Sequence, residues 1–339
     1  MNPLTRRRFL AVSALTATGI AVPFALTRKK DAPVPSEKTA AAGEPFIWRG
    51  IALGSGAELR IYHPDRRFTE TLAQKALIEV LRLEKIFSLY RDDSAISRLN
   101  REGRLNSPPA DLLAVLSLSR KIHRATKGAF DPSIQPLWNL YADYFRRHPK
   151  AETLPSEADM KKALRLVGFD KVRFDDAAVS FAEKGMGLSL NGIAQGYITD
   201  KIVELLRKNG IRRALADMGE IRGLDDGKVG TWRVGIKNPQ DESQVLLTVP
   251  LQNQAFATSG GYGTTMDEAG KFTHLFDPRT GLATPRYRSI SVMAATAAVA
   301  DAFSTAFSVM PKTDIRTAAE GEDAKVWLVD GENKVETVG

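Results

Sequence analysis

Helical spacing of hydrophobic residues, together with capping residues, predicts five helices along the chain. Leu72, Ala76 and Val80 follow one another at intervals of four, so they share one face of a helix expected over 69–87. Ser156 is a residue type that caps helix N-termini, and it opens a helix that reaches residue 167. The other expected helices span 111–126, 192–208 and 297–310.

Alternation of hydrophobic and polar residues predicts strands between these helices. The stretch 46–62 has this pattern on both sides of a glycine-containing bend, and a second hairpin is expected from 172–174 and 179–181. Further short strands are expected at 214–218, 232–236, 245–249, 255–257, 289–294 and 325–329. Helices and strands alternate without the regular period of a doubly wound sheet, which favours the α+β class.

Composition and charge narrow the class of protein. The chain has 339 residues, 43% of them hydrophobic, which is enough for one large domain or two intimate ones. Its formal net charge is +8, but six Lys and Arg residues lie within the first 30 residues, which have no acid, and the rest carries about +2. No stripe of Lys and Arg interleaved with aromatic residues is present in the sequence, so we exclude nucleic acid as a partner.

The first 45 residues have the pattern of an exported protein. Thr5–Leu10 contains three successive arginines and precedes a mildly hydrophobic stretch, 11–26, which is typical of a twin-arginine export signal over 1–30. This stretch is too short and too rich in small residues for a transmembrane span, and the alternative is a disordered basic tail. A linker is expected over 31–45 and a single functional domain over 46–339. We therefore expect a periplasmic protein that uses the twin-arginine export machinery.

Cysteine is absent from the sequence. This absence excludes disulfides, thiolate zinc sites, a cysteine nucleophile and a lipidated cysteine.

The stretch Leu188–Tyr197 is a short apolar run that turns through Gly192 directly into the helix expected over 192–208. A helix that begins this abruptly leaves backbone N–H groups unpaired at the positive end of its dipole. Such an end binds anions, so the stretch predicts a nucleotide phosphate site.

Two oxygen-bearing side chains, Asp301 and Thr305, lie four apart on the helix expected over 297–310, so they share one face. With a backbone carbonyl and water, their oxygens suit Mg²⁺. The alternative is a solvated helix face or a helix-terminal hydrogen bond. The alanines around the pair favour close approach of another backbone instead.

The segment His274–Gly281 places an imidazole, a carboxylate and a guanidinium within eight residues. It contains a turn signal in Asp277–Pro278, which is a sufficient structural explanation. The functional interpretation gives His274 acid/base work and Arg279 a phosphate contact or a role in bracing the turn.

Aromatic rings lie beside polar groups in two further segments, Phe87–Tyr90 and Gly128–Ser133. Each alone indicates a buried ring and a cap, but together they could hold a flat heterocycle between them. A bend of hydroxyl residues and glycines, Thr258–Tyr262, could approach a ligand closely.

These segments, in this order, resemble the FAD:protein FMN transferase family, also called the ApbE family of flavin transferases. The resemblance covers about 51–310. The motifs that carry it are Ser88–Tyr90 through Asn100, Gly128–Pro132, Gly192–Tyr197 with Asp200, Ala257–Gly260, His274–Gly281, and Ala300–Asp301 through Thr305.

The resemblance implies one α+β flavin transferase fold with mixed sheets flanked by helices. It implies transfer of FMN from FAD to a Thr or Ser of another protein as a phosphoester, with Mg²⁺ as cofactor and AMP as the leaving product. The metal ligands would be the Gly192 carbonyl, Asp301 and Thr305, and the catalytic residues His274 and Asp301. The residues implied for FAD binding are Tyr90, Ala129, Phe130, Asp131, Ser189, Gln195, Thr258, Phe276 and Arg279.

The sequence departs from the family pattern at four positions. The family usually has Asp at Ser189, Gly or Ser at Asn191, Lys or Glu at Gln195, and commonly Met at Leu53. The carboxylate missing at Ser189 is a possible base or metal-side hydrogen-bond acceptor. Two other functions therefore stay open: a non-catalytic flavin-binding accessory protein and a Mg²⁺-dependent FAD pyrophosphatase.

The variant Leu190–Tyr197, together with the twin-arginine leader, resembles the NosX branch of the family, which is associated with nitrous oxide reduction. By this narrower resemblance the acceptor would be a NosR-like membrane protein with a periplasmic flavin domain.

Overall fold

The computed structural model of the chain describes residues 44–227 and 230–338. The predicted export signal over 1–30 lies outside the described residues, as does nearly all of the predicted linker over 31–45. The described residues belong to one compact unit. None of the helices described is long and apolar enough to cross a membrane.

The main sheet of the described unit has eight strands, and each pairing within it is antiparallel. Across the sheet the strands are β1 (Phe46–Ala52), β2 (Ser55–Tyr62), β6 (Arg213–Asp217), β7 (Ile221–Leu224), β10 (Ala255–Gly260), β11 (Ser289–Ala294), β12 (Lys325–Val329) and β13 (Val335–Val338). The order brings β10 beside β7, although 30 residues separate these strands in the chain.

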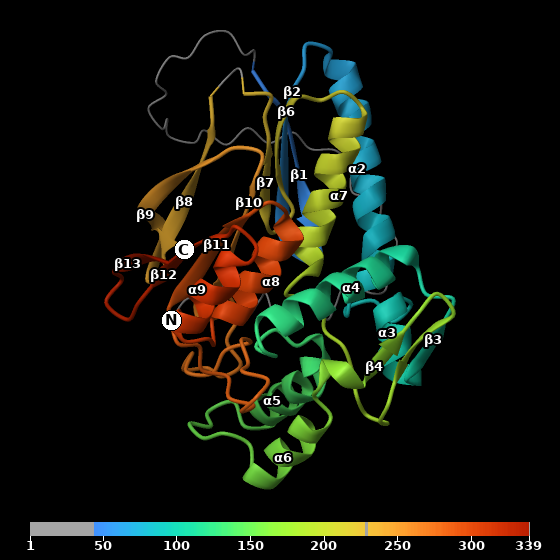
Figure 1. Cartoon of the computed structure of the whole chain (residues 1–339), viewed down its shortest axis with the longest axis vertical. Helices are drawn as coiled ribbons and strands as arrows, with labels where there is room; N and C mark the ends of the chain where they lie inside the picture. The colour runs from blue at the N-terminus through green and yellow to red at the C-terminus, as the bar shows by residue number, and fades with distance from the viewer. Residues whose placement is uncertain (1–43, 228–229, 339) are drawn as a thin grey trace. The chain divides into compact units, whose positions relative to one another are not determined.

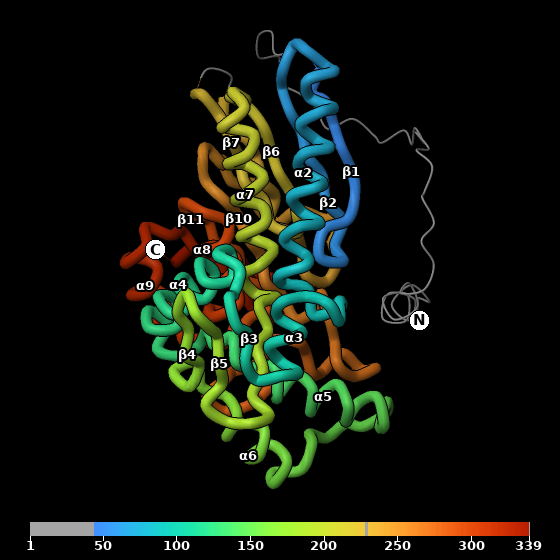
Figure 2. Tube along the Cα trace, turned by 90° about the vertical axis from the view of Figure 1, so that its right-hand side faces the viewer, coloured from blue at the N-terminus to red at the C-terminus, as the bar shows by residue number. Residues whose placement is uncertain are grey.

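Three helices pack on one face of this sheet and enclose the main hydrophobic core (Figure 1). They are α2 (Arg66–Phe87), α7 (Ala194–Lys208) and α8 (Ala297–Phe307). Helices α2 and α7 run side by side (Figure 2). The hydrophobic faces that predicted these helices are the buried ones: Leu72, Ala76 and Val80 of α2 are at most 2% exposed.

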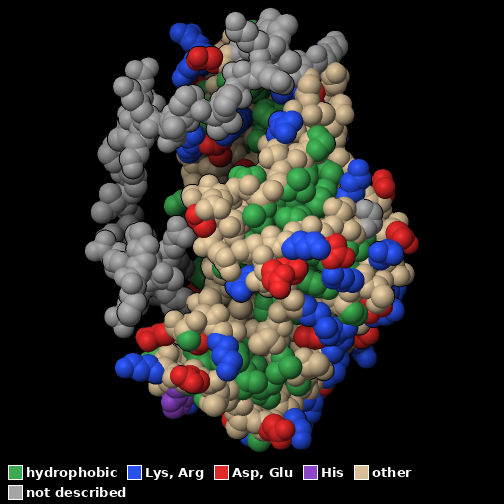
Figure 3. Space-filling model, turned by 90° about the vertical axis from the view of Figure 1, so that its left-hand side faces the viewer, with side chains coloured by type: hydrophobic (Ala, Val, Ile, Leu, Met, Phe, Trp, Pro, Cys, Tyr) green, Lys and Arg blue, Asp and Glu red, His purple; other side chains and the backbone are tan. Residues whose placement is uncertain are grey.

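The opposite face of the sheet is covered by a hairpin of β8 (Trp232–Asn238) and β9 (Asp241–Leu251). Its inward residues, among them Trp232 and Val249, form a second core with Phe256 and Trp327 of the sheet. Figure 3 shows the side of the molecule on which this hairpin lies, with hydrophobic and charged side chains interspersed at the surface.

The remaining elements lie beyond the lower end of the main sheet as drawn in Figure 1. They are α3 (Ala95–Glu102), α4 (Ala110–Ala125), α5 (Gln135–Arg147) and α6 (Glu157–Arg165), and a small sheet of β3 (Arg104–Asn106), β5 (Ala178–Phe181) and β4 (Val172–Phe174). Helix α9 (Lys312–Glu320) lies instead beside α8 and contacts β13 of the main sheet. Three single turns of 3₁₀ helix lie at Pro132–Ile134, Phe169–Lys171 and Gly261–Gly263. A third hydrophobic cluster joins α5 to the segment around Phe276.

The predicted α+β class, with helices flanking the sheet, is confirmed. Several predicted helix bounds were wrong. Helix α2 begins at Arg66 and not at residue 69, and α6 ends at Arg165 and not at residue 167. The helix expected from residue 192 begins at Ala194, because Ile193 has φ −154° and ψ −26° and residues 191–193 form a turn. The helix expected to reach residue 310 ends at Phe307.

Candidate active site

Helices α7 and α8 meet at Gly196, and their backbones touch there. A Cβ atom on Gly196 would lie 2.2 Å from the carbonyl oxygen of Ala297. At the same point the Gly196 N–H donates to Oδ2 of Asp301 at 3.1 Å. Small residues on both helices allow this approach, as the alanines of 297–310 indicated.

The predicted phosphate site at the start of α7 needs a correction. The N–H groups of Ile193 and Ala194 both donate to the carbonyl oxygen of Leu190, at 3.0 and 2.8 Å. The Gly196 N–H donates to Asp301, so the anion at this helix end is a carboxylate of the chain itself. Most of the backbone donors that the abrupt start predicted are thus already paired.

The structure brings together the three residues predicted to bind a metal. Asp301 and Thr305 lie one turn apart on α8. The Cα of Gly192 lies so close to α8 that a Cβ on it would be 2.7 Å from Oγ1 of Thr305. Their oxygens come from a carbonyl, a carboxylate and a hydroxyl, which are the ligand types that Mg²⁺ prefers. Among the residues described, no group of three or more His, Cys, Asp or Glu side chains could hold a metal.

Ser259 is a further hydroxyl at this point, which the sequence did not single out from its neighbours. Its Oγ lies 2.7 Å from Oγ of Ser304 and 3.5 Å from Oγ1 of Thr305. Thr258, predicted to bind the cofactor, lies on the other face of β10, where its Oγ1 is 2.8 Å from Oγ of Ser291. The buried Ala257 shares its face with Ser259, so alternation along β10 was a signal for Ser259.

Asp301 is only 4% exposed, and burial raises the pKa of its carboxyl to about 7. The Gly196 N–H opposes this rise and the charge of Asp200 adds to it. Within the described residues Asp301 forms no ion pair with Lys, Arg or His. A buried carboxylate without a cationic partner is costly, and a bound metal ion would remove that cost.

Asp200 holds the start of α8 in place. Its carboxylate accepts the N–H groups of Ala297 and Ala298 at 2.8 and 3.0 Å, and it is paired with the guanidinium of Arg222 on β7. Burial raises the pKa of Asp200, and Arg222 counteracts that rise. The position of Asp301, one turn further along α8, therefore depends on this pair.

Gln195 and Ser189 are both partly exposed near the start of α7. The Gln195 amide donates from Nε2 to Oγ of Ser55 at 3.0 Å and packs against Gly219. Ser189 donates its backbone N–H to the carbonyl oxygen of Pro132 at 2.7 Å, which ties the Gly192 turn to the segment after Phe130.

His274 is held by the carbonyl oxygen of Thr264, which lies 2.9 Å from its Nδ1. Burial lowers the pKa of His274, so the neutral imidazole is favoured. The preceding residue, Thr273, packs against Gly261, which follows the end of β10. Within the described residues no hydrogen bond joins His274 to Asp301 or Thr305.

Two other predicted residues of the His274 segment have structural contacts. The ring of Phe276 is 7% exposed and packs edge-on against Tyr141, with ring centroids 4.9 Å apart. Arg279 binds both carboxylate oxygens of Asp277 at 2.8 Å and reaches the carbonyl oxygen of Val309 at 3.3 Å. Of the two roles weighed for Arg279, these contacts match bracing of the turn.

The aromatic segments differ in exposure. Tyr90 is 55% exposed, whereas Ala129 and Phe130 are nearly buried. Asp131 is also buried, and its carboxylate accepts the N–H groups of Ser133 and Phe169 at 2.8 and 3.0 Å. Burial raises the pKa of Asp131. The Tyr90 ring is therefore accessible at the surface, whereas the Asp131 carboxylate is used in hydrogen bonds that join its own segment to Phe169.

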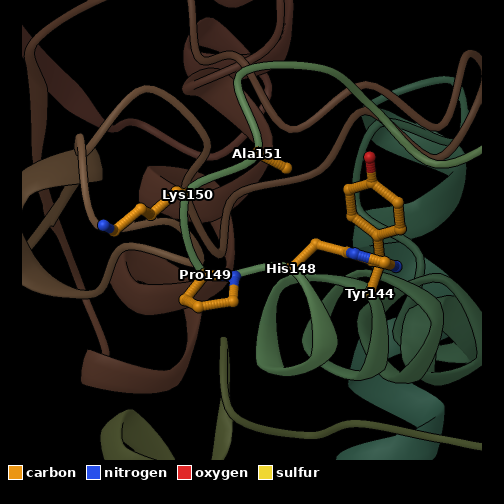
Figure 4. A pocket seen from close by; sticks show the side chains of 5 residues that line it. All are labelled: Tyr144, His148, Pro149, Lys150 and Ala151. Atoms are coloured by element: carbon orange, nitrogen blue, oxygen red, sulfur yellow. The ribbon is translucent and has the colours of Figure 1, made fainter.

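A pocket at the C-terminal end of α5 contains none of the predicted residues (Figure 4). It is lined by Tyr144, His148, Pro149, Lys150 and Ala151. We assign it no part in the site.

Comparison with known proteins identifies relatives of this chain. A family model described as the ApbE family matches residues 53–328. The chain is 30% identical over 255 residues to the FAD:protein FMN transferase of Haemophilus influenzae, which covers 71% of this chain and 73% of that protein. It is 27% identical over 324 residues to the enzyme of the same name from Salmonella typhimurium, covering 92% and 91%.

The fold is that of solved structures of this family. The crystal structure of the ApbE protein from Thermotoga maritima matches with a TM-score of 0.77 at 24% identity, covering 87% of this chain and 97% of that one.

Proposed function

The chain belongs to the ApbE family, and from this premise we propose that it is an FAD:protein FMN transferase that uses Mg²⁺ and modifies a Thr or Ser of an acceptor protein. The observation that carries the proposal is the meeting of Gly192, Asp301 and Thr305 between α7 and α8.

The residues at this point fit a magnesium ion. They offer a carbonyl, a carboxylate and a hydroxyl, and Asp301 is buried without a cationic side chain beside it among the described residues. When bound, Mg²⁺ would neutralise negative charge on the pyrophosphate and on the departing AMP. The protein's part is to orient the FAD phosphates and the acceptor hydroxyl in line.

The proposed reaction exchanges the phosphoanhydride bond of FAD for a phosphoester bond to the acceptor. The acceptor oxygen forms a bond to the phosphorus of the FMN half, while the bond from that phosphorus to the bridging oxygen breaks and AMP leaves with that oxygen. The acceptor hydroxyl gives up a proton, and we assign it to Nε2 of His274. The Nδ1–H of His274 donates to Thr264, which leaves Nε2 as the basic nitrogen, and burial keeps the ring neutral by lowering its pKa.

The isoalloxazine ring is proposed to lie against Tyr90, whose ring is exposed. Ser189 and Gln195 are partly exposed beside Gly192 and are proposed to contact the cofactor. Ala129 and Phe130 are proposed to support the binding site from the core.

The proposed setting of the reaction is the periplasm. The twin-arginine pattern of Thr5–Leu10 supports export, and the variant Leu190–Tyr197 supports a NosR-like acceptor with a periplasmic flavin domain, in nitrous oxide reduction. An acceptor of this kind is a separate protein, so the active site has to remain open to a macromolecule.

Intact-mass spectrometry tests this proposal. The flavin domain of a NosR-like protein is incubated with the mature chain, FAD and Mg²⁺. We expect a mass gain equal to FMN minus water, and no gain in the presence of EDTA. A gain that persists in EDTA would refute the metal requirement. Free FMN produced at a rate that the acceptor does not change would instead identify a pyrophosphatase, and FAD bound without turnover a flavin-holding accessory.

A further inference from the structure

Asn100, near the end of α3, belongs to the motifs that carry the family resemblance, and the proposed function gives it no role. Its side-chain amide binds the backbone of Leu188 with both ends: Nδ2 donates to the Leu188 carbonyl oxygen at 2.8 Å, and Oδ1 accepts the Leu188 N–H at 2.7 Å. The two residues are 88 apart in the sequence. An amide that makes both bonds pairs with Leu188 as a neighbouring strand would.

Leu188 has no sheet to provide these two bonds. It is 0% exposed, and residues 186–190 belong to no helix or strand. Buried backbone N–H and C=O groups that lose their partners are costly, so this segment would shift if the Asn100 amide were removed. Asn100 therefore determines where this part of the backbone lies.

The backbone between Leu188 and Gly192 has little freedom to absorb such a shift. The Ser189 N–H is bound to a carbonyl oxygen of another segment. The Leu190 side chain is fully buried, and its carbonyl oxygen accepts two N–H groups from the turn that follows. A displacement of Leu188 is therefore passed on to Gly192, whose Cα lies against Thr305 of α8.

The other end of α3 is attached to the segment of Tyr90. Oγ of Ser97, in the first turn of α3, donates to the carbonyl oxygen of Ser88 at 3.4 Å. Oγ of Ser88 accepts the Tyr90 N–H at 3.2 Å. One helix of eight residues thus contacts the Tyr90 segment at its first turn and, through Asn100, the Leu188 segment at its last turn.

We propose that Asn100 is a positioning residue for FMN transfer, which holds the Gly192 carbonyl at the metal site and sets its distance from the Tyr90 ring. It acts through the backbone of Leu188 and does not itself touch FAD or the cation. The inference rests on the proposed function, because it requires the cation at Gly192 and the flavin ring at Tyr90.

The test measures Asn100→Ala in two ways. Binding of Mn²⁺, which takes the same oxygen ligands as Mg²⁺, is followed from the electron paramagnetic resonance signal of the free ion, without FAD or acceptor. We expect the dissociation constant for Mn²⁺ to rise about tenfold. At saturating FAD and Mg²⁺ we expect kcat for transfer to fall about tenfold, with the KM for the acceptor domain unchanged. If Asn100 only stabilised the fold, all three values would equal those of the wild type below the melting temperature.

The matched control is Asp175→Ala. Asp175 also makes two hydrogen bonds to backbone, because it accepts the N–H groups of Ala177 and Ala178 at 2.9 Å in the turn between β4 and β5. Within the described residues its side chain has no hydrogen bond to α7 or α8. We expect this variant to bind Mn²⁺ and to transfer FMN as the wild type does. An unchanged Mn²⁺ affinity or an unchanged kcat in Asn100→Ala would overturn the inference, as would an equal loss in both variants.

Asp301→Asn separates this inference from the proposed function. If Asp301→Asn binds Mn²⁺ like the wild type, the metal site itself is wrong. If Asp301→Asn loses binding and Asn100→Ala keeps it, only the role of Asn100 is wrong.

Asn100→Asp keeps the test decisive if Asn100→Ala does not fold. Its side chain has the same shape and still accepts the Leu188 N–H, but it turns a carboxylate oxygen towards the Leu188 carbonyl oxygen, where the amide donated. The added negative charge alone would attract Mn²⁺ more strongly, so only a displaced backbone explains weaker binding. We expect weaker binding than in the wild type, and an equal or higher affinity would overturn the inference.

Discussion

Gly192 contributes to the site by having no side chain. Thr305 lies where a Cβ would be, with its Oγ1 2.7 Å from that position. We therefore predict that Gly192→Ala pushes α8 away from the Gly192 carbonyl and weakens Mn²⁺ binding about tenfold, the equivalent of roughly 1.4 kcal/mol.

The control for Gly192→Ala is Gly56→Ala on β2, where a Cβ would meet nothing within 4 Å. Mn²⁺ titration of both variants, with their melting temperatures, checks the prediction. Equal affinities would mean that the Gly192 carbonyl is not a ligand.

The state of His274 sets the pH dependence expected for transfer. Burial lowers its pKa, so the neutral form that accepts a proton persists to more acidic pH than in a free histidine. As pH falls through this lowered pKa, His274 becomes protonated and the rate should drop. We predict that the acid limb of the rate profile lies below about pH 6.5, the ordinary pKa of histidine.

His274→Gln should lower the rate and remove this acid limb, whereas His148→Gln, at the pocket beside α5, should leave the profile unchanged. The rates are measured from pH 5 to pH 8 with saturating FAD. An acid limb that survives in His274→Gln would assign the proton to another group.

At the scale of elements, the contact between α7 and α8 determines where Asp301 lies. A Cβ on Gly196 would be 2.2 Å from the Ala297 carbonyl oxygen, which is backbone and cannot rotate away. We predict that Gly196→Ala forces the helices apart and destabilises the fold by about 1–3 kcal/mol or more.

Urea unfolding, followed by circular dichroism, measures this loss. Gly331→Ala is the control, because a Cβ there would meet nothing within 4 Å. A Gly196→Ala variant as stable as this control would show that the helix contact adjusts at little cost.

The sequence predicted the elements with strong periodicity and missed those whose signals were weak. The helices with clear hydrophobic faces and most of the strands were predicted, including β11 with its bounds. Helix α5 was missed because Pro136 and its many aromatic residues obscured the spacing of Leu137, Tyr141 and Phe145, which are the residues it buries. The short strands β7 and β13 gave too few residues to show alternation.

The site could be predicted only as far as local patterns reach. Helical spacing predicted Asp301 and Thr305 as metal ligands, and the family resemblance implied the Gly192 carbonyl as a third ligand. Alternation along β10 placed Ser259 on the face of Ala257, but its contacts with Ser304 and Thr305 join positions 45 and 46 residues apart, which local sequence could not predict. Asp131 was assigned to the cofactor, but its carboxylate accepts the N–H groups of Ser133 and of the distant Phe169, a contact that nearby sequence cannot reveal.

At the scale of the whole molecule, the proposed cation connects elements that are distant in the chain. It would contact both the turn that precedes α7 and the helix α8. Because a ligand that binds only the folded state stabilises it, Mg²⁺ at about 100 times its dissociation constant should add roughly 2.7 kcal/mol. We predict a rise in melting temperature with Mg²⁺.

Differential scanning calorimetry of the wild type and of Asp301→Ala, each with Mg²⁺ or with EDTA, checks this prediction. The shift should vanish in Asp301→Ala. An equal shift in both proteins would place the stabilising ion elsewhere.

The hydrogen bond from Gly196 to Asp301 spans 105 residues of sequence. During synthesis, α7 therefore leaves the ribosome long before the helix that completes the site exists. A chain released early, or cut anywhere between these two helices, has the glycine turn but neither oxygen ligand of α8. Unfinished molecules would thus lack the proposed metal site, which is complete only once α8 (Ala297–Phe307) has been synthesised.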